Sequence, residues 1–210
     1  MGADAGELRK GWEAATEGLG TPAARGEIFD QLCAAYTGPD RHYHGIGHIA
    51  DCLREFDPVR AQATNARAVE LAIWFHDVVY DGRRADNEQR SADAADAALQ
   101  RLGGSATLRR DVGDLILLTR HTQTPATVDG MLMIDIDLAS LGIAPDAFDA
   151  NGDAIRREYP HVADADFFRA RINLLGRFLD RPRIYYTQVF FDRYERAARA
   201  NLERTLLALR

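Results

Sequence analysis

The chain has 210 residues, of which 46% are hydrophobic and 28% are charged, and its formal net charge is -6. This length can bury a substantial core, and we expect a single domain over residues 1–210. The acidic balance argues against a nucleic-acid polymer or a membrane surface as the partner. No apolar run is long enough to cross a bilayer, and the first residues lack the features of a signal peptide, so we expect a cytoplasmic protein.

Almost every segment has apolar residues at helical spacing, which predicts an all-α fold. Thr21-Pro22 and Ser105 are typical helix starts. The apolar run from Met131 to Leu138 suits a strand or a buried helix, and the Gly142 stop favours helix. The predicted helices lie, in chain order, at roughly residues 8–19, 21–36, 48–56, 63–80, 88–102, 105–121, 131–141, 146–159, 164–179 and 190–206.

The two cysteines are too few for a disulfide framework or a thiolate metal site. Both Cys33 and Cys52 lie in apolar helical patterns. We therefore predict that they are buried free thiols.

The apolar helical run Ala68–Phe75 ends in the adjacent pair His76-Asp77. A carboxylate beside an imidazole at the end of an apolar helix is costly unless it is paired. A divalent cation can bind both the nitrogen and the oxygen. The simpler alternative is a buried histidine followed by an aspartate that caps a loop.

Three of the six histidines, His42, His44 and His48, fall in one short stretch. His44 and His48 are four residues apart, so on a helix they share a face and point to one site. The alternative is a solvated or capping cluster. We interpret His42, like His161, as a surface residue.

Two acidic residues, Asp135 and Asp137, interrupt the apolar run from Met131 to Leu138. Carboxylates in such a run are difficult to bury without a counter-charge. Either one is therefore a candidate fourth ligand for a cation held by His48, His76 and Asp77.

In this order, His48, His76-Asp77 and the later aspartate resemble the HD superfamily of metal-dependent phosphohydrolases. The similarity covers roughly residues 8 to 208 and is closest to a poorly characterised bacterial branch of predicted phosphohydrolases. The motifs that carry it are Tyr43-His44 with His48-Ile49, Phe75-His76-Asp77 with Val79-Tyr80-Asp81, Asn87-Glu88 with Ser91-Ala92, Asp137-Leu138 with Leu141-Gly142, Arg156 with Glu158-Tyr159, and Glu195 with Ala198-Arg199 and Asn201-Leu202.

The resemblance implies a helical bundle of the HD-domain and phosphodiesterase type. It implies one or two divalent ions per chain, for which Mn, Fe, Co, Ni, Zn and Mg are all candidates. The implied metal ligands are His48, His76, Asp77 and Asp137. By similarity to cyclic-nucleotide phosphodiesterases, His44 is the implied general acid, and Asp77 is implied to serve catalysis as well as metal binding.

The remaining candidates have weaker support. Asp135 is a candidate partner behind the metal ligands. His121 either contributes to a second metal or interacts with the negative end of a helix dipole. The loop arginines Arg83 and Arg84 are candidates for holding phosphate. Asn87 and Glu88 either contact substrate or form the cap and first turn of a helix.

The expected activity is hydrolysis of a phosphate ester of a nucleotide or another small molecule, with a phosphorylated small molecule as the partner. One alternative is a regulatory module that binds a metal or a nucleotide without hydrolysis. Another is a di-iron oxygenase with His121 at a second metal, and a third is a helical interaction domain without a site. The aromatic residues of the last helix would support a homodimer.

Overall fold

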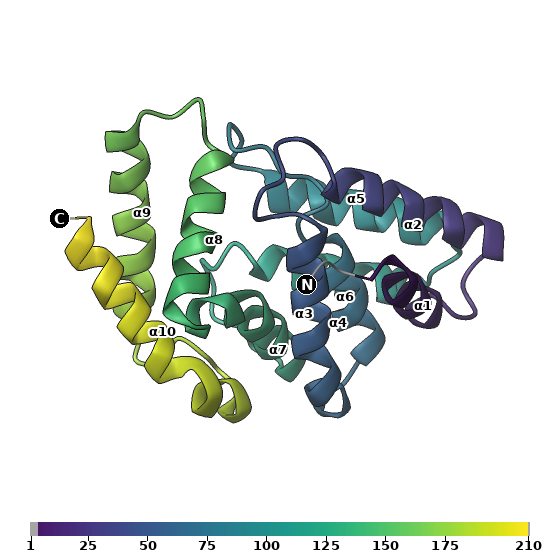
Figure 1. The fold of residues 1–210 in the computed structure, drawn as a ribbon. Coiled ribbons are helices and arrows are strands. Elements are labelled where there is room, and N and C mark those ends of the chain that lie inside the picture. Colours follow the sequence, from purple (N-terminus) through teal and green to yellow (C-terminus); the bar gives the residue numbers. More distant parts are fainter. Residues whose placement is uncertain (1–3, 210) are drawn as a thin grey trace.

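Ten α-helices and two short 3-10 helices make up the computed structural model, which describes residues 4–209 (Figure 1). No strand occurs in that range, so the prediction of an all-α fold is confirmed. The elements are α1 (Ala5–Ala15), α2 (Pro22–Tyr36), α3 (Ile46–Phe56), η1 (Asp57–Gln62), α4 (Ala66–Phe75), α5 (Asn87–Arg101), α6 (Ala106–Leu118), α7 (Val128–Asp137), η2 (Leu138–Gly142), α8 (Pro145–Arg157), α9 (Asp164–Leu179) and α10 (Gln188–Ala208).

Capping side chains set several helix starts. The hydroxyl of Thr21 accepts the Ala24 N–H at 3.2 Å, and that of Ser105 accepts the Leu108 N–H at 3.2 Å. The same geometry at Thr127 begins α7, so the apolar run that suited strand or helix is a helix. Each cap satisfies a backbone donor that has no partner within its helix.

The predicted helix over residues 63–80 is wrong at both ends. It begins at Ala66, after the N-cap Asn65, whose side chain accepts the Ala68 N–H at 3.1 Å, and its last residue is Phe75. His76 is the C-cap, and Asp77 lies in the turns that follow. His76 and Asp77 therefore lie in the turn that follows α4. The backbone changes direction there, so their side chains can point toward a neighbouring helix.

Helix α4 is the centre of the core. All of its residues from Ala68 to Phe75 are buried, and it contacts α1, α3, α5, α6 and α7. At its end, the ring of Trp74 meets that of Trp12 edge-on at 5.7 Å, and its carbonyl accepts the Tyr36 hydroxyl at 2.9 Å. Burial of each large apolar side chain stabilises the fold by about 1.5–3 kcal/mol. These contacts fix the chain just before His76.

The C-terminal helices α8, α9 and α10 lie on the left in Figure 1, and α10 packs against η2. Asn201 of α10 donates to the carbonyls of Leu141 and Ile143, both at 3.0 Å. Gly142 allows this approach, because a Cβ atom there would lie 2.6 Å from the Cβ of Tyr194. Since η2 continues directly from α7, these contacts also fix the end of α7, which carries Asp137. No helix in residues 4–209 has the length and apolarity needed to span a membrane.

Candidate metal centre

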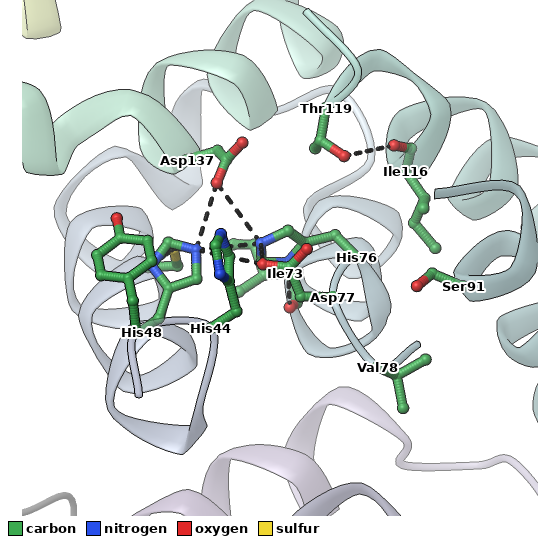
Figure 2. Close-up of polar contacts among 12 residues, drawn as sticks. His44, His48, Ile73, His76, Asp77, Val78, Ser91, Ile116, Thr119 and Asp137 are labelled. Atoms are coloured by element: carbon green, nitrogen blue, oxygen red, sulfur yellow. Dashed lines mark hydrogen bonds and ion pairs between the residues drawn. The ribbon is translucent and has the colours of Figure 1, made fainter. Parts of the chain in front are cut away.

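Side chains from three parts of the chain point toward one another in Figure 2: His48 from α3, His76 after α4 and Asp137 at the end of α7. The Nε2 atoms of the two histidines are 3.2 Å apart. Asp137 Oδ1 lies 3.3 Å from the Nε2 of His48 and 3.5 Å from that of His76. All three side chains are largely excluded from solvent, so their polar atoms face one another instead of water.

Asp77 completes this cluster. Its Oδ2 lies 3.2 Å from His76 Nε2 and 3.8 Å from His48 Nε2. The structure thus brings together the four residues for which the sequence predicted metal binding, with two imidazole nitrogens and two carboxylates around one point. This donor set suits Mn, Fe, Co, Ni or Zn.

A sulfur atom borders the same point. Cys52 Sγ lies 3.8 and 3.7 Å from the two ring nitrogens of His48. One potential ligand atom from each of Cys52, His48, His76 and Asp137 lies within 4.8 Å of the others, so this buried group could hold a metal ion. Cys52, for which the sequence predicted no part in a metal site, therefore lies among the candidate ligand atoms. Cys33, expected to be buried, is only half-buried.

Opposite charges stabilise one another in this cluster. Burial lowers the pKa of His76, but the carboxylates of Asp77 and Asp137 outweigh burial and hold the pKa well above its ordinary value. Burial raises the pKa of both carboxyl groups, and the surrounding imidazoles outweigh it and lower the pKa. Burial, then the Asp137 and Asp77 carboxylates, raise the pKa of the Cys52 thiol. Without a metal ion, the proton on His76 therefore offsets the negative charge of the buried carboxylates. A bound cation would displace this proton.

Asp135 does not face the cluster. Its buried carboxylate accepts the N–H groups of Tyr186 and Thr187 at 2.8 and 2.7 Å, and the Thr187 hydroxyl at 2.6 Å. These contacts hold the loop that begins α10. Of the two aspartates in the apolar run, Asp137 lies in the cluster and Asp135 supports the loop.

His121 lies three residues beyond the end of α6, not at its last turn as predicted. Its Nε2 is 2.9 Å from Asp137 Oδ2, on the side away from His48 and His76. Its φ of 54° is unusual for a residue other than glycine, and Arg181 donates to its carbonyl at 3.0 Å. His121 is therefore held in a strained conformation that places its ring against Asp137.

His44 lies in the loop before α3, so it does not share a helical face with His48 as predicted. Its ring stacks on Tyr80 with 4.1 Å between centroids, and its Nδ1 is 2.6 Å from Glu158 Oε2. Glu158 Oε1 accepts the N–H groups of His42, Tyr43 and His44 at 2.8, 2.7 and 2.9 Å. One carboxylate at the end of α8 thus holds this loop, a role that the motif position of Glu158 did not predict.

Burial raises the pKa of Glu158, but the hydrogen bonds from His44 and from the backbone outweigh burial and lower the pKa below its ordinary value. The carboxylate is therefore charged near neutral pH. A charged acceptor of this kind orients the His44 ring and fixes which nitrogen faces away.

Arg41 is a second residue whose role was missed. Its guanidinium donates to the carbonyls of Asp77, His44 and Val78 at 2.6, 2.8 and 2.9 Å. It therefore joins the loop of His44 to the turn that carries Asp77. Only the tertiary structure reveals this, because the two segments are more than thirty residues apart.

A cleft of about 350 Å³ opens beside the cluster. His44, Asp77 and Asp137 line it, together with apolar side chains of η2, α8 and α9 that include Leu138, Phe148 and Phe178. Its size is within the range of small-molecule sites.

The loop residues predicted to hold substrate differ in position. Arg84, Asn87 and Glu88 line the cleft, whereas Arg83 lies at a neighbouring hollow. Arg84 binds the Asp86 carboxylate through two nitrogens at 2.7 and 2.8 Å. Asn87 is the first residue of α5 and bonds to the backbone of Asp81 at both ends of its amide. The side chains of Arg84 and Asn87 thus have protein partners. Elsewhere, His42 and His161 are exposed, as predicted.

Comparison of the chain with models of protein families, with curated proteins and with solved structures finds no match. The fold and the site define an all-helical protein whose buried nitrogen and oxygen cluster could hold a metal ion. The cluster borders a cleft large enough for a small molecule.

Proposed function

We propose that the protein is a metal-dependent phosphohydrolase that cleaves a phosphate ester of a nucleotide or another small molecule. The observation that carries this proposal is the convergence of two imidazoles and two carboxylates at one end of a cleft. The resemblance of the same residues to the HD superfamily supports it, because phosphoryl transfer requires charge neutralisation and positioning above all.

In this proposal His48, His76, Asp77 and Asp137 hold the ion. A divalent ion bound there supplies positive charge for the phosphoryl oxygens and lowers the pKa of a water molecule. The protein positions the ligands through their neighbours: Arg41 holds the turn of Asp77, and His121 orients Asp137 from the opposite side.

His44 is the proposed general acid. Glu158 occupies its Nδ1, which leaves Nε2 to give a proton to the leaving oxygen. The stacked ring of Tyr80 and the three backbone contacts of Glu158 limit its rotation. Such fixed orientation is what proton transfer at one defined atom requires.

A second ion is the basis of the alternative oxygenase function. Asp137 presents Oδ1 to His48 and His76, and Oδ2 to His121, so its carboxylate has one oxygen on each side. Two ions per chain with His121 as a required ligand would favour this alternative. One ion, retained in His121→Ala, would favour the phosphohydrolase.

Metal loading followed by turnover tests the proposal. Chelator-stripped protein is reloaded with each candidate ion and assayed on p-nitrophenyl phosphate, bis-p-nitrophenyl phosphate and a set of nucleotides. We expect metal-dependent phosphate release that is lost, together with the metal, in Asp77→Ala. Glu203→Ala, which changes an exposed acid of α10, is the matched control. Full turnover by Asp77→Ala would contradict the mechanism, and stoichiometric metal without any turnover would favour a regulatory module.

A further inference from the structure

Three arginines line the cleft, and they differ in their partners. Arg84 is bound to Asp86, and Arg120 lies 3.8 Å from a carboxylate oxygen of Glu88. Arg171 forms no ion pair or hydrogen bond with any residue in the part of the chain that the structure describes. One cation of the cleft therefore lacks a counter-charge in the protein.

Arg171 is also half-buried. It projects from α9 toward α8, where its NH2 would lie 3.8 Å from a Cβ atom at Gly152. Burial lowers its pKa, and the groups that act most on its charge are the phenols of Tyr43, Tyr159 and Tyr80, with no carboxylate among them. All three tyrosines lie in loops and line the cleft. A half-buried guanidinium without an anion is costly, so an anionic ligand would be stabilised here.

We infer that Arg171 forms an anion subsite of the cleft, separate from the metal cluster. The ligand class that fits is a small phosphate ester that carries a second anionic group. This inference rests on the proposed function, because it places the first phosphate at the cluster. The planar guanidinium can bind two oxygens of a phosphate or carboxylate at once.

The cleft wall indicates the body of this ligand. The apolar side chains of Leu138, Phe148 and Phe178 line the same cleft as the cluster and Arg171. Apolar walls with a few polar groups at fixed positions are typical of sites for small molecules with an apolar or aromatic body. A nucleoside bisphosphate has an aromatic body and two phosphates, so it is a suitable probe of this class.

The test compares adenosine 3′,5′-bisphosphate with adenosine 5′-monophosphate. Binding is measured by calorimetry on manganese-loaded protein, and initial rates are measured in parallel. We expect Arg171→Met to weaken binding of the bisphosphate about 10- to 100-fold, as for a lost charged hydrogen-bond pair, and to change the monophosphate less than about twofold. Arg171→Lys keeps the positive charge but loses the two-pronged guanidinium. Its affinity for the bisphosphate should lie between those of the wild type and Arg171→Met.

Arg169→Met is the matched control, because it removes one charge from an exposed position of α9 that pairs with Asp166. It should bind both ligands as the wild type does. Equal losses for the two ligands in Arg171→Met, or no loss for either, would overturn the subsite. Selective loss of bisphosphate binding without turnover by any loaded protein would support the subsite and contradict the phosphohydrolase.

Discussion

Replacement of Glu158 by alanine tests how the loop before α3 is held. The carboxylate is only 5% exposed and accepts three backbone N–H groups as well as His44 Nδ1. Alanine leaves these donors without an acceptor. Each unsatisfied buried donor costs about 1–3 kcal/mol, and here several donors lose the same acceptor.

We therefore expect Glu158→Ala to lower the free energy of unfolding by about 3–5 kcal/mol, which for a chain of this size corresponds to a fall in Tm of about 6–20 °C. Thermal unfolding followed by circular dichroism measures it. The control Glu203→Ala should stay within about 0.5 kcal/mol of the wild type, as exposed substitutions usually do. A Glu158→Ala protein as stable as this control would show that the carboxylate does not stabilise the loop before α3.

The pH dependence of stability gives the same prediction a second test. Because the folded pKa of Glu158 lies below its ordinary value of 4.5, its carboxylate stabilises the fold fully above pH 4.5. That contribution is lost as the pH falls through the folded pKa. As the pH falls below 5, the Glu158→Gln variant should therefore lose less stability than the wild type does. Urea unfolding at a series of pH values measures this difference. An unchanged acid dependence would contradict this assignment.

Three further substitutions separate the site from its supports. Asp135→Ala should lower stability by about 2–4 kcal/mol in urea unfolding, because backbone donors of the α10 loop lose their acceptor, while metal content stays unchanged; metal loss from a stable variant would contradict this. Arg41→Met should lower both Tm and metal affinity in calorimetry, since the turn of Asp77 loses its tie to the His44 loop; unchanged affinity would oppose that role. Cys52→Ala should keep the metal stoichiometry in elemental analysis, because two imidazoles and two carboxylates remain around the same point. Loss of the ion would identify the sulfur as a ligand.

Helices and their starts could be predicted because they depend on local physics. Apolar spacing, a capping hydroxyl and a stopping glycine act within a few residues, as Ser105 at the start of α6 illustrates. Helix ends were predicted less well. Apolar residues resume at Val78 and Val79, beyond the last helical residue Phe75, so periodicity alone extended α4 across His76 and Asp77.

The candidate ligands were identifiable because charged groups in apolar runs need partners. Composition could not choose between Asp135 and Asp137. In a helix, residues two apart lie on nearly opposite faces, so only one of the two carboxylates can point to a given site. Tertiary packing decides which face of α7 contacts α3 and α4. The local sequence of α7 does not predict that face.

The supporting residues could not be predicted, because their roles arise only from contacts between distant segments. Arg41 reaches the turn of Asp77, and Glu158 reaches back to the loop of His44. In sequence each resembles an ordinary surface charge. The role of Arg171 could not be predicted either, because only the folded cleft around it shows that no carboxylate is its partner.

Calorimetric titration of chelator-stripped protein with manganese and with zinc measures whether the cluster binds a metal ion. We expect saturable binding of at least one ion per chain, with proton release, because the raised pKa of His76 keeps its ring protonated without metal. We also expect His48→Gln and Asp137→Asn to abolish this binding, whereas Glu203→Gln should not. Absence of binding to the wild type, or equal binding to the two cluster variants, would contradict a metal centre at His48, His76, Asp77 and Asp137.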